Sequence, residues 1–374
     1  MVSHIAIVCG AGYISGKEVM ALELATGLRD AGYDVEVVAT LWGDGVFAKR
    51  LQALNFPVHQ MRLGYISATP RFDEIRMTAD QMIHLPSLYW SYRRFLRTVA
   101  PTRIIHTNWQ HLLLLLPFLK SERDLFWVHE IAPDKIQYRK LFALFSKRLS
   151  HFVAVSQAVA EGLVTIGMPR DQVAVIHNGL AKLDGEKPEG RQLHEGTRIG
   201  IVGQIGPWKG HEDLLRAFAL LLFRGCANWE LHVFGANTHP YAAHLRALAR
   251  ELNLNDKIVW HGFVSDRAQI YTGIDICVVP SRSDDPLPTV AIEAAMSGLP
   301  CVATRKGGLP EIVKDQITGL LVDSNNPEQL ARALHLLINN AALRVRMGTA
   351  ARQFAYDHFS RERLVKEFAG LIER

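Results

Sequence analysis

Short apolar runs alternate with longer stretches of helical periodicity along the chain. The runs at residues 5–9, 35–40, 104–107 and 126–129 have the length of buried strands, and residues 17–31 have the spacing of a helix. Strands that alternate with helices form a parallel sheet covered by helices on both faces. The pattern predicts an α/β protein with a doubly wound sheet.

The alternation is interrupted once and then starts again. Residues 181–197 contain four Gly or Pro residues and little apolar periodicity, which predicts a linker. Strand-like runs resume at residues 198–202, 230–235, 258–263 and 275–280. Because 374 residues exceed the usual size of one domain, we expect two domains, 1–180 and 198–360.

Composition narrows the class of protein only in part. The net charge of +5 and the isoelectric point near 9 favour an anionic ligand or surface, although no basic and aromatic nucleic-acid recognition module is apparent. The four cysteines lack metal-ligand spacing, which predicts free thiols in a reducing compartment. No basic leader precedes the first apolar run, and the longest run, 112–119, is far shorter than the ~20 residues of a membrane span. We therefore expect a cytoplasmic protein that uses no metal.

Three glycines follow the first predicted strand. Gly10, Gly12 and Gly16 are spaced G-x-G-x-x-x-G, whereas a dinucleotide-binding turn reads G-x-G-x-x-G. This difference argues against an NAD site in which Asp34 or Glu36 would bind a ribose. The backbone N–H groups at the start of the next helix still attract anions.

The stretch at residues 281–304 combines acids with turn residues, and it reads S-R-S-D-D-P-L-P-T-V-A-I-E-A-A-M-S-G-L-P-C-V-A-T. A buried strand leads into a polar loop that holds Asp284 and Asp285, and Glu293 follows on a short helix. Ligands bind beyond the carboxyl ends of the strands in an open parallel sheet, where we expect Asp285. The alternative is an ordinary strand–helix unit with a solvated acidic loop.

This stretch resembles the donor site of retaining family-4 glycosyltransferases, which have the GT-B fold. That family places two glutamates eight positions apart; here Glu293 is the second acid and Asp285 takes the place of the first. The resemblance implies that Glu293 holds ribose hydroxyls and that Asp285 binds sugar hydroxyls or lies near the anomeric carbon. Further donor contacts are implied between the acids, at Pro286, Leu287, Pro288 and Thr289.

A second matching segment follows the strand at residues 198–202. Family members have Gly-Arg and then Lys-Gly there, with both cations on the donor diphosphate. Lys209 matches, but Gln204 stands where arginine is usual, so one charge is replaced by a neutral hydrogen-bonding group. Either donor binding is weaker, or another cation such as Arg282 or Lys306 compensates. The alternative for Lys209 is an ordinary solvated lysine on a loop.

Four glycines add candidate donor contacts. Gly307 and Gly308 match the family's Gly-Gly-x-Pro-Glu segment, where backbone N–H groups at a helix start can face an anion. Gly16 matches a Gly-rich turn that faces the donor phosphates in the family. The base is commonly held after the strand at residues 258–263, which makes Gly262 and Phe263 candidates for the base site.

Histidines at strand ends are candidates for the sugar or acceptor side. The family often has a histidine near His129 that touches the donor sugar or the acceptor, whereas a lone histidine is more often structural. We therefore weigh both roles for His129. His106 and His111 are weaker candidates.

The resemblance implies two facing doubly wound Rossmann-like domains with an interdomain cleft, and a last helix, 361–374, that packs back on the first domain. It also implies transfer of a sugar from a nucleotide-sugar donor to a glycan or lipid-linked acceptor with retained configuration, without cofactor or metal. Asp285, His129 and Lys209 are the catalytic candidates. The setting that we expect is bacterial cell-surface polysaccharide or glycolipid assembly. A sugar-nucleotide epimerase and a non-catalytic nucleotide-sugar-binding protein remain alternatives.

A basic segment at residues 135–150 contains five cations and no acid, interleaved with Tyr138, Phe142 and Phe145. This composition is typical of a helix that lies on an anionic membrane surface. The segment therefore predicts peripheral attachment to the inner membrane face. The alternative is that its apolar side chains pack on the first sheet.

Overall fold

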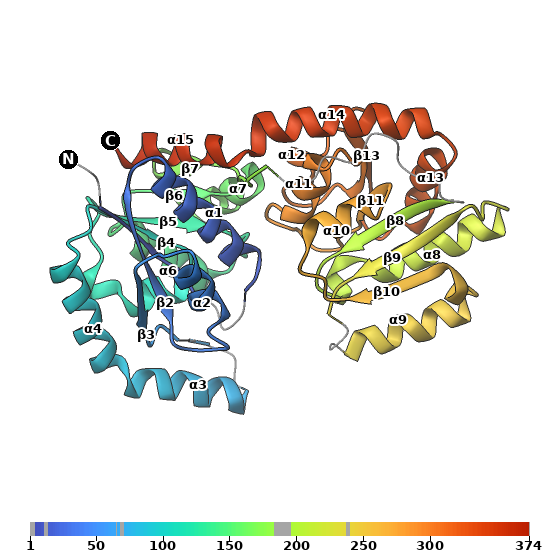
Figure 1. Cartoon of the computed structure of the whole chain (residues 1–374). Coiled ribbons are helices and arrows are strands. Elements are labelled where there is room, and N and C mark those ends of the chain that lie inside the picture. The colour runs from blue at the N-terminus through green and yellow to red at the C-terminus, as the bar shows by residue number, and fades with distance from the viewer. Residues whose placement is uncertain are drawn as a thin grey trace. The chain divides into compact units, whose positions relative to one another are not determined.

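The computed structural model describes residues 4–10, 14–64, 66–67, 71–182, 196–236 and 240–373. The chain divides into two compact units, Met1–Gly179 with Arg361–Arg374, and Leu180–Ser360 (Figure 1). Gly12 and most of the expected linker, residues 183–195, lie outside the described residues.

The first unit is built on a parallel sheet with the strand order β3-β2-β1-β4-β5-β6-β7. Its strands are β1 (His4–Val8), β2 (Asp34–Thr40), β3 (Val58–Met61), β4 (Arg103–His106), β5 (Asp124–Val128), β6 (Phe152–Ala154) and β7 (Val173–Val175). Its helices are α1 (Gly16–Asp30), α2 (Val46–Ala53), α3 (Phe72–Ile83), α4 (Leu85–Thr98), α5 (Trp109–Leu114), α6 (Ile136–Ser146), α7 (Gln157–Thr165) and α15 (Arg361–Ile372). The strand order reverses between β1 and β4, and ligands bind at such a point in open α/β sheets.

The helix α15 packs against α1 although the two are far apart in sequence (Figure 1). Gly27 of α1 allows this approach, since a Cβ there would lie 2.3 Å from Val365 Cγ2. Arg361 also reaches the buried carboxylate of Glu23, with Nη2 and Oε2 2.6 Å apart. Close packing and an ion pair thus attach the last helix to the first unit.

The second unit contains a parallel sheet with the order β10-β9-β8-β11-β12-β13. Its strands are β8 (Thr197–Val202), β9 (Trp229–Phe234), β10 (Ile258–Gly262), β11 (Ile276–Val279), β12 (Cys301–Thr304) and β13 (Gly319–Val322). Its helices are α8 (His211–Phe223), α9 (Pro240–Glu251), α10 (Arg267–Thr272), α11 (Thr289–Met296), α12 (Leu309–Ile312), α13 (Pro327–Ile338) and α14 (Ala341–Phe359). The order reverses between β8 and β11, so the loops after these strands meet at one edge of the sheet. Both units have the predicted α/β architecture of a doubly wound parallel sheet.

The strands lie in the interior, which explains why continuous apolar runs in the sequence predicted them. All residues of β5, β11 and β12 are buried, as expected for strands that have helices on both faces. In the part of the chain that the structure describes, no helix has the length and apolarity needed to cross a membrane.

Candidate functional site

Lys209 lies in the turn that follows β8, at the end of a short 3-10 helix, Pro207–Lys209. Gly210 comes next with φ +74°, and a Cβ at this position would lie only 1.8 Å from the carbonyl oxygen of Pro280. The backbone N–H of Arg282 donates to the Trp208 carbonyl at 2.8 Å. The turn after β8 is therefore fastened to the loop after β11.

This fastening brings Lys209 to Asp285. The Lys209 Nζ and Asp285 Oδ2 atoms are 2.5 Å apart, and both side chains are partly buried. A charge pair that is shielded from water interacts more strongly than one on the open surface. Two residues that belong to separate predicted motifs thus form one contact.

Gly307 and Gly308 support the loop that carries Asp285. A Cβ on Gly307, whose φ is +51°, would lie 2.0 Å from the Asp285 carbonyl oxygen, and one on Gly308 would lie 2.2 Å from that of Pro286. The N–H of Gly308 donates to the Asp285 carbonyl at 2.8 Å, and the N–H of Gly307 donates to Asp284 Oδ1 at 3.2 Å. Both N–H groups are already hydrogen-bonded, so an anion would have to displace these partners.

Glu293 is buried on α11 and accepts hydrogen bonds from α10. The Tyr271 hydroxyl donates to Oε2 at 2.7 Å, and Arg267 Nη1 donates to Oε1 at 3.2 Å. Burial and the neighbouring Glu293 carboxylate raise the pKa of Tyr271 well above its usual value, so the hydroxyl stays protonated and donates. Arg267 and Tyr271 were not predicted from the sequence, although their spacing of four on one helix face was a readable signal.

The remaining donor-side candidates fall into two groups. Leu287 and Pro288 are buried, Pro286 and Thr289 are half-buried, and together they form the turn from the loop into α11. Gln204 and Phe263 are exposed, Phe263 by 78%. Gly262 ends β10, and its carbonyl accepts from the N–H of Gly235 at 2.8 Å.

The two compensating cations are already paired with acids. Arg282 binds both carboxylate oxygens of Asp213, at 2.7 and 2.6 Å, and lies 3.5 Å from Glu212. These carboxylates raise the pKa of Arg282. Lys306 Nζ lies 3.6 Å from Asp284 Oδ1. The structure thus gives Arg282 the role of fixing the loop to α8, rather than that of a spare charge in place of arginine at Gln204.

In the first unit, His129 follows β5 at the carboxyl edge of the sheet. Burial, and to a smaller extent the charge of Lys17, lower its pKa to about 3, so the imidazole is neutral. Its Nε2 atom is enclosed and has no hydrogen-bond partner among the described residues. Lys17 also affects the pKa of His111 and of Glu130, which places these groups around the start of α1.

Gly16 begins α1, and a Cβ there would meet no atom of the described residues within 4 Å. The preceding Ser15 directs its N–H and its hydroxyl to Glu18 Oε2, at 2.9 and 2.5 Å. Glu18 is fully buried and therefore occupies part of the anion-attracting helix start. The protein itself does not require glycine at position 16 for packing.

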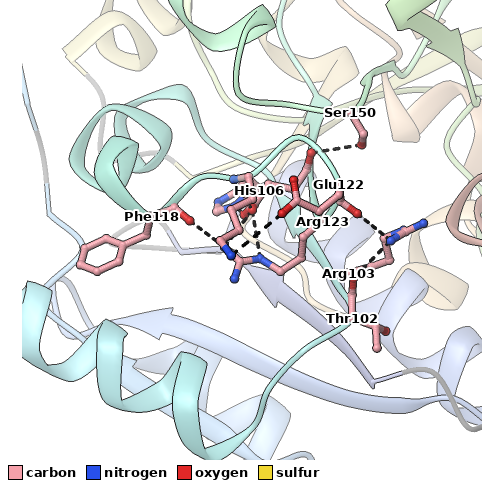
Figure 2. Close-up of polar contacts among 9 residues, drawn as sticks. Thr102, Arg103, His106, Phe118, Glu122, Arg123 and Ser150 are labelled. Atoms are coloured by element: carbon pink, nitrogen blue, oxygen red, sulfur yellow. Dashed lines mark hydrogen bonds and ion pairs between the residues drawn. The ribbon is translucent and has the colours of Figure 1, made fainter.

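His106 belongs to a structural network in the interior, as Figure 2 shows. Its Nε2 lies 2.7 Å from Asp124 Oδ1, and both side chains are fully buried. Arg123 donates to the other oxygen of Asp124 through Nε and Nη2, at 3.0 and 2.9 Å, and Nη2 also donates to the Phe118 carbonyl. The network joins β4 and β5, so His106 has a structural role.

His111 is buried on α5. Burial lowers its pKa to about 3, and the nearby Lys17 contributes. Because Lys17 lowers the pKa of both histidines, His111 and His129 lie at the same carboxyl edge of the first sheet.

The basic segment 135–150 turns two of its aromatic side chains inward. Phe142 and Phe145 are buried and pack against each other, and Phe142 also packs on Phe126 and Phe152. Arg139 is paired with Asp134 at 2.7 Å. The cations of the segment are exposed, but these two rings complete the core of the first unit and do not face a membrane.

Comparison with known proteins identifies the family. The model for group 1 glycosyl transferases matches residues 186–354, and the model for glycosyltransferase family 4 matches residues 14–181. The two matches cover nearly the whole chain, one in each unit. The chain belongs to the family-4, group 1 glycosyltransferases.

Individual relatives agree with this assignment. An uncharacterized glycosyltransferase from Haemophilus influenzae is 24% identical, over 96% of this chain and 97% of that protein. An uncharacterized glycosyltransferase from Methanocaldococcus jannaschii is 29% identical over 58% of this chain, which spans 57% of that relative. A D-inositol 3-phosphate glycosyltransferase from Corynebacterium glutamicum is 35% identical over 42% of this chain, and the match covers 38% of that relative.

Among solved structures, Anabaena Alr3699/HepE in complex with UDP and glucose has a TM-score of 0.81 at 19% identity, over 99% of both chains. This similarity shows the GT-B fold.

Proposed function

We propose that the protein is a retaining glycosyltransferase that moves a hexose from a nucleotide-sugar donor to an acceptor hydroxyl. The observation that carries this proposal is the contact between Lys209 and Asp285 at the carboxyl edge of the second sheet. Family membership supports the reaction class. The side chains of Lys209, Asp285 and Glu293 would bind the nucleotide-sugar donor. UDP is the first nucleotide to test, since the similar Anabaena protein was solved in complex with UDP.

Each of these side chains has a definite task in the proposed reaction. The bond between the anomeric carbon and the leaving phosphate breaks, so negative charge grows on the diphosphate. Lys209 is placed to stabilise this charge, and one preorganised donor of this kind contributes ~3 kcal/mol in suitable sites. Asp285, which is one methylene shorter than the family's glutamate, would bind sugar hydroxyls. Glu293 would accept from the ribose, because a carboxylate oxygen that already accepts one hydrogen bond can accept another.

In the first unit we propose His129 as the candidate on the acceptor side. A neutral imidazole at a strand end can accept or donate one hydrogen bond to a sugar hydroxyl. The proposed acceptor is a glycan or a lipid-linked sugar of the bacterial cell surface, and we propose a cytoplasmic protein that attaches peripherally to the inner membrane face.

The test is a screen of nucleotide sugars by thermal unfolding, followed by turnover. A donor at ~100 times its dissociation constant adds ~2.7 kcal/mol to the free energy of unfolding. Release of nucleoside diphosphate with an acceptor, and an NMR assignment of the product anomer, then establish transfer and retention. EDTA should leave the rate unchanged, since Lys209 takes the charge-stabilising role.

The alternatives give different results in the same assay. An epimerase would interconvert the donor sugar without an acceptor, and a binding protein would be stabilised by the donor without any turnover.

A further inference from the structure

The helix α3 turns its apolar side away from the protein. Phe72 and Ile83 are 80% and 75% exposed, and Ile75 and Met82 are exposed beside them. Spacings of three, seven and one residue place these four side chains on one face of the helix. This face has the width of the apolar stripe that a surface helix normally buries.

The side of α3 that is directed toward the unit carries Gln81, Thr78 and Glu74, and Met77 lies beside them with 38% of its surface exposed. Gln81 is its buried residue, Thr78 Oγ1 accepts from the N–H of Ser67 at 3.1 Å, and Glu74 accepts from the Ser67 hydroxyl. An ordinary surface helix has the reverse arrangement, with polar groups in water. The described residues thus leave the apolar face of α3 exposed.

The next helix, α4, also exposes a tryptophan among arginines. Trp90 is 66% exposed, and Arg93, Arg94 and Arg97 are exposed around it. The Arg94 guanidinium lies 5.6 Å from the centre of the Trp90 ring. The other face of α4 is anchored in a core cluster through buried Leu88, Tyr92 and Phe95, and Figure 1 shows α3 and α4 in succession at one edge of the unit.

Charge decides between the possible occupants of this surface. Residues 71–98 contain five arginines and three acids, and α4 contains no acid. Glu74 is bound to Ser67, and Asp80 lies 3.8 Å from Arg62 and 3.6 Å from His84. The outward charge is therefore mainly positive. A second copy in a two-fold dimer would bring this arginine cluster against itself, which is repulsive.

We propose that the α3–α4 surface, formed by Phe72, Ile75, Met82, Ile83, Trp90, Arg93, Arg94 and Arg97, docks on an anionic lipid bilayer. Exposed apolar side chains enter the boundary between headgroups and acyl chains, tryptophan favours that interface, and arginines attract anionic headgroups. Unlike the buried rings of residues 135–150, the apolar side chains of this surface are free to enter that boundary. The proposal rests on the peripheral membrane attachment proposed above and names the surface that makes it; it does not depend on sugar transfer, because neither donor nor acceptor enters it.

The test is flotation with vesicles of phosphatidylcholine mixed with phosphatidylglycerol, compared with phosphatidylcholine alone, at low salt. Two variants change the surface: Phe72→Ser with Ile83→Ser, and Arg93→Gln with Arg94→Gln and Arg97→Gln. The matched control removes three cations from α6 and its end, through Lys140→Gln, Lys147→Gln and Arg148→Gln. All of these side chains are exposed, so thermal unfolding should be unchanged.

Wild-type protein and the control should float with the anionic vesicles and not with the neutral ones. The arginine variant should bind about a hundredfold more weakly, since each cation near the surface contributes about 1 kcal/mol, and the apolar variant should also lose binding. Tryptophan emission should shift to the blue with anionic vesicles, and Trp90→Phe should remove most of that shift.

Three results would overturn the proposal. The first is wild-type protein that ignores anionic vesicles at low salt. The second is binding that is lost in the control and kept in both surface variants. The third is a wild-type dimer in sedimentation equilibrium that Phe72→Ser with Ile83→Ser converts to a monomer, because the surface would then be covered by a second copy.

Discussion

The ammonium group of Lys209 lies 2.5 Å from the carboxylate of Asp285, across 76 positions of sequence. Each charge compensates the other. A donor diphosphate that reaches Lys209 would have to share the cation with Asp285 or replace it. The pair therefore links binding of the leaving group to the position of the carboxylate.

Lys209→Ala and Asp285→Asn should have opposite effects on nucleotide binding. Loss of the lysine removes the charge that holds the diphosphate, so the affinity for nucleoside diphosphate should fall about tenfold or more, in line with the ~1.5–3 kcal/mol of charge-assisted hydrogen bonds. Loss of the Asp285 charge releases Lys209, so this affinity should be kept or rise while transfer falls. Calorimetry with UDP, or with the nucleotide that the screen selects, measures both.

The matched control for this pair is Lys306→Ala, which removes a neighbouring cation that pairs with Asp284 at 3.6 Å. Its effect on nucleotide affinity should be small. If Lys209→Ala and Lys306→Ala lost nucleotide affinity equally, the affinity would depend on the overall positive charge near the site. That result would contradict a specific role for Lys209.

Glu293→Gln should weaken nucleotide binding and also lower the free energy of unfolding, because it leaves a buried hydrogen-bond donor without its acceptor. The amide keeps the shape, but its NH2 group cannot accept from Tyr271 or Arg267, and the bond to a ribose hydroxyl loses charge assistance. Tyr271→Phe leaves the carboxylate charged and removes one positioning bond, so its effect should be smaller. A calorimetric ranking of wild type, then Tyr271→Phe, then Glu293→Gln is expected. Unchanged affinity in Glu293→Gln would mark the carboxylate as structural.

Gly307→Ala and Gly16→Ala should separate packing from ligand binding. The added methyl at position 307 would lie 2.0 Å from the Asp285 carbonyl oxygen, so the loop must move, and both melting temperature and donor binding should fall. At position 16 the methyl would meet no atom of the described residues, so the melting temperature should stay constant. Any loss of turnover in Gly16→Ala would then come from contact with substrate. A lower melting temperature in Gly16→Ala but not in Gly307→Ala would contradict these two roles.

Three buried histidines predict how stability depends on pH. Burial lowers the pKa of His111 and that of His129 to about 3, and that of His211 to about 4, from an ordinary value of 6.5. Between about pH 6.5 and pH 4 the unfolded chain binds these protons and the folded chain does not. The free energy of unfolding therefore falls as the pH is lowered through this window, by up to about 1.4 kcal/mol per pH unit for each histidine.

Melting temperatures across this window, measured for wild type, His111→Leu and the exposed control His335→Asn, check the prediction. His111→Leu should flatten the dependence on pH, whatever it does to the absolute stability. If the melting temperature of His111→Leu depended on pH as steeply as that of wild type, His111 would not contribute to this pH dependence.

The fold was predictable because its signals are local. Apolar runs such as residues 5–9 and 126–129 became β1 and β5, since strands covered on both faces need continuous apolar sequence. The break near residue 181 lies beside the boundary between Gly179 and Leu180 that divides the two units. Lys209, Asp285 and Glu293 could be selected because their motifs are short and contiguous.

The surroundings of these residues could not be predicted in this way. In the sequence, Arg282 was a candidate spare cation, but in the structure it binds Asp213 of α8. Gly307 was a candidate anion-binding position, but in the structure it packs against the carbonyl oxygen of Asp285. Phe142 and Phe145 resembled a membrane face until the sheet covered them, while the exposed apolar face of α3 was not predicted.

The sequence alone determined the doubly wound α/β architecture, and it selected candidate residues for a donor site. The tertiary structure decided which of those residues meet, which charges are already paired and which apolar side chains remain in water. The physical reason is that periodicity and motif spacing record local geometry. Burial and ion pairing depend on contacts between positions such as 209 and 285, which only the folded chain brings together.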